Sequence, residues 1–373
     1  MKKFLFVAII IFVTALLVIV ASEVALRLIG STPAQFYKCR DDAVHHKLRP
    51  GYRGRVVTPE YRVVYKANSK GFRGSDRAIA KTGRVTRIVV LGDSFTMGQG
   101  VREEAVFTSL LENKLNNAWS SEGRKFEVIN LGMQSYSPLI EYIALKNYGL
   151  EYDPDMVILM LDWSDFQDDM TYERRTVFDD AERPVMTTAE NPAKGSLEFL
   201  GPVIEASKKT YLYHFVRNRL RKTAVSATEN IIPGDPVTDR YAILRDPPPE
   251  AAGELYDRTQ KYIRMVSELA VENDITFMMV LYPYGVHVGG DEWGEGRKQF
   301  LFQEGTTISS KPFEIMEKFA DEYDIECLNL LEPFRDSKES SLFFPYDGHF
   351  TESGHELVSD TLFDYINTKF SAE

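Results

Sequence analysis

The 373-residue sequence has little cysteine and no excess of positive charge. Its formal net charge is −11, from 44 Lys and Arg against 55 Asp and Glu, and this balance argues against a nucleic-acid partner because phosphate backbones are bound by basic surfaces. Cys39 and Cys327 are the only cysteines, and one candidate pair carries no spacing pattern. Two interpretations stay open: a Cys39–Cys327 disulfide, and an inert Cys327 thiol buried in an apolar strand.

The chain also lacks internal repeats and low-complexity tracts. Its 44% hydrophobic residues are enough to form a sizeable core. The carboxylate run DFQDD (165–169) does not follow the spacing of a calcium loop, and we expect it to be a solvated cluster. We therefore expect neither a metal site nor a cofactor.

A long hydrophobic run is present at the N-terminus. Residues 4–21, FLFVAIIIFVTALLVIVA, are eighteen apolar or nearly apolar residues that follow Lys2 and Lys3. A membrane-spanning helix needs roughly 17–25 such residues, whereas the core of a cleavable signal peptide has about 7–15. The sequence predicts an anchor over 1–29 with its basic end inside and the rest of the chain extracytoplasmic. Cleavage after Ala25 is the alternative.

The remaining chain alternates between apolar strands and amphipathic helices. We expect strands at 87–91, 126–132, 155–163, 275–283 and 325–331, and helices at 103–119, 137–149, 254–274, 312–323 and 353–370. This alternation predicts an α/β fold, a three-layer α/β/α sandwich around a parallel sheet of about five strands. We assign 85–373 to this domain, with an insertion at about 170–250, and 30–84 to a juxtamembrane segment with a short hairpin.

One predicted strand ends abruptly in polar residues. In VVLGDSFTMGQGV (89–101), Ser94 stands between the strand and the following helix. Residues at the carboxyl ends of parallel strands lie at the edge where ligands bind. Ser94 therefore suits a nucleophile whose own N–H stabilises an oxyanion, although a hydroxyl needs a base to act as one. The alternative is a serine that caps the helix.

The base is expected near the C-terminus. In FFPYDGHFTESGHELV (343–358), Asp347 and His349 are two residues apart, and in an extended segment both side chains point to the same side. The carboxylate can then hold the imidazole in one tautomer, as in a Ser-His-Asp triad. His355 is an alternative base, but no carboxylate stands next to it, and a structural role in the last helix fits it better.

Three segments resemble the blocks of the SGNH/GDSL hydrolase superfamily. They are GDSF (92–95), VINLGMQSYSP (128–138) and DGHFTESGH (347–355), and the resemblance extends from about Asn68 to the C-terminus apart from 170–250. It implies an ester hydrolase in which Ser94 is the nucleophile, His349 the base and Asp347 its partner. It also implies that Gly132 contributes a second N–H to the oxyanion hole.

One block departs from the family pattern. Where the family has Gly-x-Asn-Asp, this chain has DWSD (162–165), so that Ser164 replaces the asparagine that donates to the oxyanion. Ser164 is a weaker candidate donor, and Asp162 would disfavour an oxyanion if it pointed into the site. Asp93, His287 and Trp293 are expected to shape the substrate cleft, with a solvated loop as the alternative for the last two.

These features predict a membrane-anchored, extracytoplasmic serine esterase that forms an acyl-serine intermediate. Its substrate would be a lipid, an acylated polysaccharide or another envelope ester. Two alternatives remain. The acyl group is passed to a sugar hydroxyl by an O-acetyltransferase, or the chain is a catalytically weak, envelope-binding relative.

Overall fold

The computed structural model describes most of the chain. The described residues are 2–29, 37–189, 239–300, 308–339 and 341–371, with 210, 212, 213, 216, 235 and 302 between them. Most of the predicted insertion at 170–250 therefore lies outside the described residues.

Five parallel strands form the central sheet, in the order β11–β10–β7–β5–β6. The strands are β5 (Val85–Leu91), β6 (Lys125–Asn130), β7 (Met156–Leu161), β10 (Thr276–Leu281) and β11 (Glu326–Asn329). Every residue of β7 is buried, as expected for a strand in the middle of a sheet that is covered on both faces. The strand order reverses between β5 and β7, which makes their carboxyl ends the expected ligand-binding edge.

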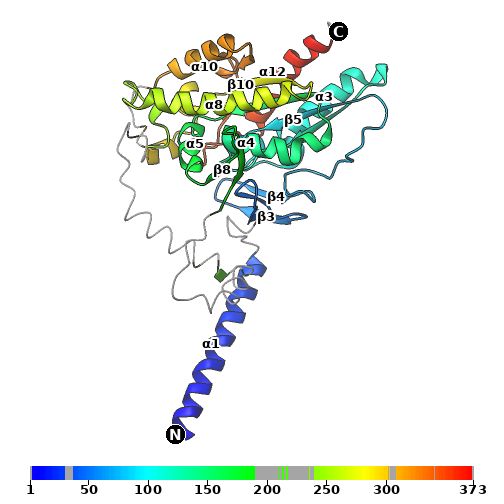
Figure 1. Ribbon diagram of the computed structural model, residues 1–373. Coiled ribbons are helices and arrows are strands. Elements are labelled where there is room, and N and C mark those ends of the chain that lie inside the picture. Colours follow the sequence, from blue (N-terminus) through cyan, green and yellow to red (C-terminus); the bar gives the residue numbers. More distant parts are fainter. Residues whose placement is uncertain are drawn as a thin grey trace.

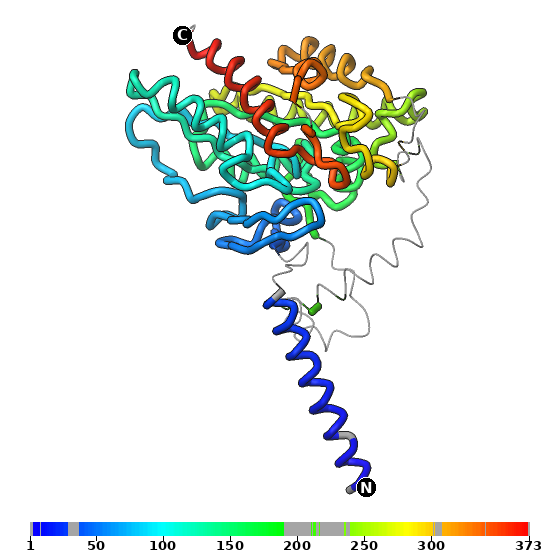
Figure 2. The backbone as a smooth tube through the Cα atoms, turned by 180° about the vertical axis from the view of Figure 1, so that it is seen from behind, coloured from blue at the N-terminus to red at the C-terminus, as the bar shows by residue number. Residues whose placement is uncertain are grey.

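Helices cover both faces of this sheet (Figures 1 and 2). On one face α3 (Phe107–Trp119) packs against α12 (Glu352–Ser371). On the other, α8 (Ala252–Val271) packs against α4 (Pro138–Ala144) and α5 (Asp165–Glu173), while α10 (Lys311–Glu322) lies against β11. The predicted three-layer α/β/α sandwich is confirmed.

Shorter elements complete the described chain. They are α2 (Ser94–Met97), α9 (Gly285–Val288), α11 (Leu331–Arg335), the strands β8 (Thr176–Phe178) and β9 (Pro184–Thr187), and the single turns η1 (Glu103–Ala105), η2 (Ser120–Glu122), η3 (Leu145–Gly149), η4 (Leu150–Tyr152), η6 (Ala242–Leu244) and η7 (Gly296–Phe300). The helix expected at 137–149 thus changes at Leu145 into a wider π turn.

The N-terminal run forms one helix, α1 (Lys2–Ile29), which projects away from the globule (Figure 1). Its part from Lys3 to Leu28 is long and apolar enough to cross a membrane, with its large side chains exposed. At about 1.5 Å per residue, these 26 residues span roughly 39 Å, which exceeds the ~30 Å hydrocarbon core of a bilayer.

Two small hairpins follow α1. The first pairs β1 (Lys38–Arg40) with β2 (His46–Leu48), and the second pairs β3 (Arg53–Val57) with β4 (Arg62–Lys66). The inner face of the β3–β4 hairpin is buried against the globule through Val56, Val63 and Tyr65. Cys39 of β1 and Cys327 of β11 are free thiols, so the disulfide that the sequence left open is not formed.

Candidate functional site

The predicted nucleophile lies where the strand order reverses. Ser94 is the first residue of α2, directly after β5, and Ser164 follows the neighbouring strand β7. The backbone reaches Ser94 through Gly92, whose φ of +151° is rare for other residues, and a Cβ at this position would run into the Thr96 side chain. The turn between β5 and α2 therefore requires glycine at position 92.

The structure brings the three predicted catalytic side chains together. Oγ of Ser94 lies 2.7 Å from Nε2 of His349, although the two residues are 255 positions apart in sequence. Nδ1 of His349 makes a hydrogen bond to Oδ1 of Asp347. Gly348, between them, has a φ of +83°, and a Cβ there would meet the indole of Trp293. This is the geometry expected of a serine, its base and the acid that orients the base.

The charges around His349 favour its protonation. Burial disfavours the imidazolium, but the Asp347 carboxylate, followed by Asp93 and Asp162, outweighs burial and raises the pKa of His349. Burial alone would raise the pKa of Asp347, yet His349 and hydrogen bonds from neighbouring side chains lower it. The pair is therefore poised to hold a proton received from Ser94.

Three further side chains fix Asp347, and the sequence pattern did not identify them. Nε2 of Gln99 lies 3.2 and 3.1 Å from the two carboxylate oxygens, and the hydroxyl of Tyr61 donates to Oδ2 at 3.1 Å. The carboxylate of Glu60 accepts the backbone N–H of Asp347 at 2.7 Å. Glu60 and Tyr61 belong to the tip of the β3–β4 hairpin, so the segment that follows α1 contributes to the site.

A small pocket opens beside Ser94, with a cavity volume of about 60 Å³. Asp93, Ser164 and Trp293 line it as predicted, whereas His287 does not. Nδ1 of His287 instead accepts the backbone N–H of Tyr284 at 3.1 Å, and burial lowers its pKa to about 4. The described lining residues are Asp93, Ser94, Phe95, Asp162, Ser164, Arg240, Tyr241, Tyr284, Trp293, Asp347, Gly348 and His349.

Gly132 is engaged away from this pocket. Its N–H donates to Oδ1 of Asn130 at 2.8 Å, and Nδ2 of Asn130 donates to the carbonyl of Thr96 at 2.6 Å and to Oγ1 of Thr108 at 3.2 Å. A Cβ at Gly132 would come within 2.7 Å of the Thr96 side chain. In this geometry Gly132 permits close packing of the loop after β6 on the nucleophile turn, and its N–H is already paired.

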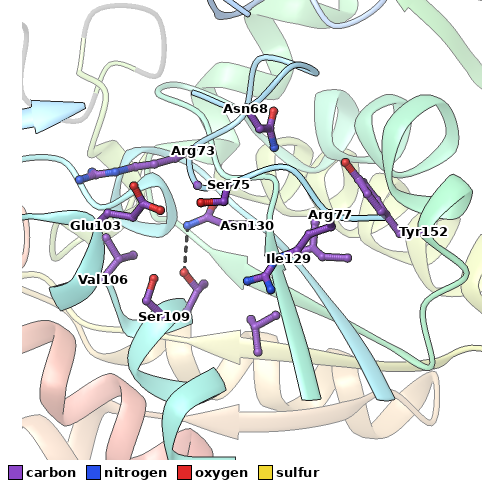
Figure 3. A pocket seen from close by; sticks show the side chains of 13 residues that line it. Asn68, Arg73, Ser75, Arg77, Glu103, Val106, Ser109, Ile129, Asn130 and Tyr152 are labelled. Carbon is purple, nitrogen blue, oxygen red and sulfur yellow. Dashed lines mark hydrogen bonds between the residues drawn. The ribbon is translucent and has the colours of Figure 1, made fainter. Parts of the chain in front are cut away.

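Behind this contact lies a second pocket, also of about 60 Å³, in which Asn130 and Arg73 are seen from close by (Figure 3). The guanidinium of Arg73 donates to the carbonyls of Met97 and Val101, at 3.0 and 2.5 Å, and to the carbonyl of Gly98. Arg73 is only 3% exposed. It therefore holds the chain that follows Ser94 from behind.

Two carboxylates adjoin the nucleophile. Asp162 accepts hydrogen bonds from the hydroxyls of Tyr282 (2.7 Å) and Tyr284 and from the N–H of Ser164 (2.7 Å), so donors surround this carboxylate on several sides. Oδ2 of Asp93 lies 3.1 Å from Oγ of Ser94. Burial, followed by repulsion from Asp162, raises the pKa of Asp93 to about 7, so near neutral pH this carboxyl is partly protonated.

The run at 165–169 differs from the expected solvated cluster. Asp165 and Asp169 are fully buried, and their oxygens accept the backbone N–H groups of Asp162 (2.9 Å) and Leu139 (3.0 Å), respectively. The expectation was wrong because both carboxylates lie in the protein interior. There they accept hydrogen bonds from the backbone just after β7 and in the first turn of α4. Asp168 forms an ion pair with Arg240 at the pocket wall.

His355 is not an alternative base for Ser94. It is fully buried in α12, and its Nδ1 accepts the backbone N–H of Phe107 at 3.4 Å. Burial lowers its pKa to about 3, so the ring is neutral and packs between helices. The imidazole at Ser94 is that of His349.

Comparison with known proteins gives similarities at the level of solved structures. No family model matches the chain, and no curated protein matches its sequence. A GDSL-like lipase from Bacteroides thetaiotaomicron is 12% identical with a TM-score of 0.35, over 76% of this chain and 89% of the lipase. An acetyl xylan esterase is 13% identical with a TM-score of 0.39, over 75% of this chain and 99% of the esterase.

A psychrotrophic esterase from Pseudoalteromonas sp. is 11% identical with a TM-score of 0.39, over 77% of this chain and 99% of that chain. Similarities of this size say nothing about the reaction or the substrate of this protein. Both must be inferred from the residues of the site.

Proposed function

We propose that this protein is a serine esterase that cleaves carboxylic esters through an acyl-Ser94 intermediate. The single observation that carries the proposal is the 2.7 Å contact between Oγ of Ser94 and Nε2 of His349, whose other nitrogen is bound to Asp347. A serine used only as a helix cap needs no imidazole at its hydroxyl, and an imidazole used only for structure needs no buried acid behind it.

In the proposed reaction, Oγ of Ser94 attacks the ester carbonyl carbon while Nε2 of His349 takes the hydroxyl proton. Asp347 stabilises the imidazolium that results. The tetrahedral oxyanion accepts the N–H of Ser94 and the hydroxyl of Ser164, which lines the same pocket. His349 then returns the proton to the leaving alkoxide. A water, activated by the same imidazole, attacks the acyl-serine and releases the acid.

The state of Asp93 bears on the first step. A hydroxyl has one proton, and Oγ of Ser94 lies within reach of both Asp93 and His349. When Asp93 is protonated it donates to Oγ, which leaves the serine proton for the imidazole. The raised pKa of Asp93, about 7, makes this arrangement available near neutral pH.

The size of the pocket favours a short acyl group. Its cavity of about 60 Å³ has room for roughly two water molecules, and Tyr241, Tyr284 and Trp293 form its aromatic wall. An acetyl group fits such a volume. Among the described residues of this wall, Tyr284 and Trp293 are buried and Tyr241 is partly buried.

The location follows from the N-terminus. We propose that α1 crosses a membrane with Lys2 and Lys3 on the cytoplasmic side, which places the catalytic domain outside. An acylated polysaccharide or another envelope ester would then be the substrate, and the enzyme would need no cofactor.

The proposal is tested on the purified full chain in detergent. It should hydrolyse 4-nitrophenyl acetate faster than a long-chain nitrophenyl ester and be labelled by a fluorophosphonate. Ser94→Ala should remove both properties, while Ser120→Ala, on a surface turn, should leave both unchanged. Absence of hydrolysis and of labelling in the folded protein would reject the esterase. Acetyl release that occurs only with an added sugar acceptor would instead identify a transferase.

A further inference from the structure

The charge of the chain is distributed very unevenly. Between Ala43 and Ser75 there are eight basic residues and one acidic residue, Glu60, a net charge of +7 in a protein whose total is −11. This basic segment includes the β3–β4 hairpin and directly follows the β1 strand next to α1. Arg73 of this segment is buried, but the cations that reach the surface favour anionic partners.

The cations of the β3–β4 hairpin gather on one face. Strand pairing sets Arg53 opposite Lys66, Arg55 opposite Val64 and Val57 opposite Arg62, which puts all six on the same side. The three arginines of this set, together with Val64, are exposed, while the opposite side is buried in the globule. We refer to Arg53, Arg55, Arg62, Val64 and Lys66 as the basic face.

The like charges of the basic face repel one another across the hairpin. Arg53 and Lys66 are directly opposed like charges, a pairing that destabilises a hairpin. Lys66 has a carboxylate, Glu103, at 3.8 Å. A surface of negative charge in front of the hairpin would attract Arg53, Arg55 and Arg62 together.

The chain length keeps the β3–β4 hairpin close to the end of α1. Ile29 ends the helix, and Tyr37 is already packed on the hairpin, with its ring 5.3 Å from that of Tyr65. Eight residues reach at most about 28 Å, whatever path they take. In both views the hairpin lies on the side of the globule nearer to α1 (Figures 1 and 2).

We propose that the basic face binds the anionic phospholipid headgroups of the membrane that holds α1. The inference rests on α1 being a membrane anchor and does not depend on the esterase reaction. Guanidinium groups bind phosphate oxygens through paired N–H donors, and exposed Val64 lies among them, facing the interface. The tip of the same hairpin, Glu60 and Tyr61, binds the Asp347 loop. Binding would therefore set the orientation of the active site above the membrane.

The test uses the full chain in nanodiscs of phosphatidylcholine, alone or mixed with phosphatidylglycerol. Backbone hydrogen exchange is measured over residues 53–66. Each basic residue near an anionic surface contributes about fivefold to binding. Amide hydrogens of the hairpin exchange when it opens locally, and headgroups that bind only the folded hairpin make this opening rarer. Exchange should therefore be about fivefold to 100-fold slower in the anionic discs than in the neutral ones. In about 1 M salt, where the Debye length is about 3 Å, the difference should vanish.

The matched variants reverse the same number of charges at two places. Changing Arg53, Arg55 and Arg62 together to Glu should abolish the slowing. Changing three exposed lysines to Glu on the distant side, Lys311, Lys318 and Lys338, should preserve it. A triple change of the arginines to Gln provides a milder version if the Glu variant unfolds.

Three results would overturn the proposal. Equal exchange in both kinds of disc would show that the basic face does not bind lipid. If inorganic phosphate, added at constant ionic strength, slowed hydrogen exchange of the hairpin in phosphatidylcholine discs, the basic face would be a site for the free anion. Slowing by an anionic polysaccharide, with none from phosphatidylglycerol, would identify a glycan surface. None of these readouts uses catalysis, so an inactive enzyme would leave the outcome interpretable.

Discussion

The hydroxyl of Tyr61 donates a hydrogen bond to Oδ2 of Asp347 at 3.1 Å, across 286 positions of sequence. The neighbouring Glu60 accepts the backbone N–H groups of Tyr346 and Asp347, at 2.8 and 2.7 Å. The hairpin tip thus holds Asp347 at two points. Tyr61 binds the side-chain carboxylate, and Glu60 binds the backbone N–H. We regard Tyr61 and Glu60 as positioning residues, because they act on substrate only through Asp347 and His349.

Tyr61→Phe should lower kcat by about tenfold while KM changes little. The variant removes one hydrogen bond to a charged group, which contributes about 1.5–3 kcal/mol when buried, and leaves the ring in place. Steady-state hydrolysis of 4-nitrophenyl acetate measures both constants. Tyr323→Phe, at an exposed tyrosine after α10, serves as the control. A change in KM alone would show that Tyr61 contacts substrate instead.

Asp93→Asn should move the acid limb of the pH–rate profile to lower pH. Activity requires neutral His349, so it is lost as pH falls through the pKa of this residue. Ionised Asp93 raises that pKa, and the neutral amide cannot do so. The limb is measured from kcat/KM against pH, with Asp321→Asn on the surface as control. A limb that stays in place or moves to higher pH would contradict the electrostatic coupling.

Gly348→Ala should reduce activity strongly. The methyl group would meet the indole of Trp293, and the φ of +83° at this position is strained for alanine. The loop would shift Asp347 and His349 relative to Ser94, and small displacements at a reacting centre can cost about 100-fold. Gly289→Ala is the matched control, because a Cβ there has no neighbour within 4 Å. Equal activity of the two variants would refute the packing argument.

Arg73→Gln should destabilise the fold by about 3 kcal/mol. The change removes a buried guanidinium that donates to three backbone carbonyls behind Ser94, and two of these carbonyls, those of Met97 and Val101, lose that charged donor outright. Urea unfolding gives the free energy. Arg102→Gln, which breaks an exposed pair with Glu352, should lower the free energy of unfolding far less. Similar losses for both variants would show that the buried contacts of Arg73 do not stabilise the turn.

The mature protein should keep its N-terminal helix. The apolar run is longer than the core of a signal peptide, so an intact mass should include residues 2–29, and alkaline washing should leave the chain in the membrane. Ser22→Trp, next to the candidate cleavage region, should not alter the mass. A mass that begins at residue 26 would show a cleaved leader.

Much of the architecture could be predicted from the sequence because strands such as β7 are apolar throughout. A strand buried on both faces has no alternative to an apolar pattern, and the following helices carry the matching periodicity. Ser94, Asp347 and His349 were recognisable for a related reason. The proposed reaction needs a serine after a strand and an acid two positions from a histidine. Few other functions require both patterns in one chain.

The supporting contacts were not predictable in the same way. Tyr61, Glu60 and Gln99 are ordinary residues whose partners are set by how a distant hairpin docks, and no local spacing encodes that docking. The burial of Asp165 and Asp169 is of the same kind. Four polar residues among five usually mark a solvated surface, and only the packing of α5 against α4 and α8 turns Asp165 and Asp169 inward.

Because Ser94 and His349 are 255 positions apart, the proposed active site is incomplete during most of the synthesis of the segment between them. At roughly 5–20 residues per second, a ribosome needs roughly 13–50 s to pass from one to the other. During that interval the emerging polypeptide has its serine without its imidazole and cannot cut esters. In the proposed reaction, hydrolysis could therefore begin only after the segment that carries His349 has been made and has docked beside Ser94.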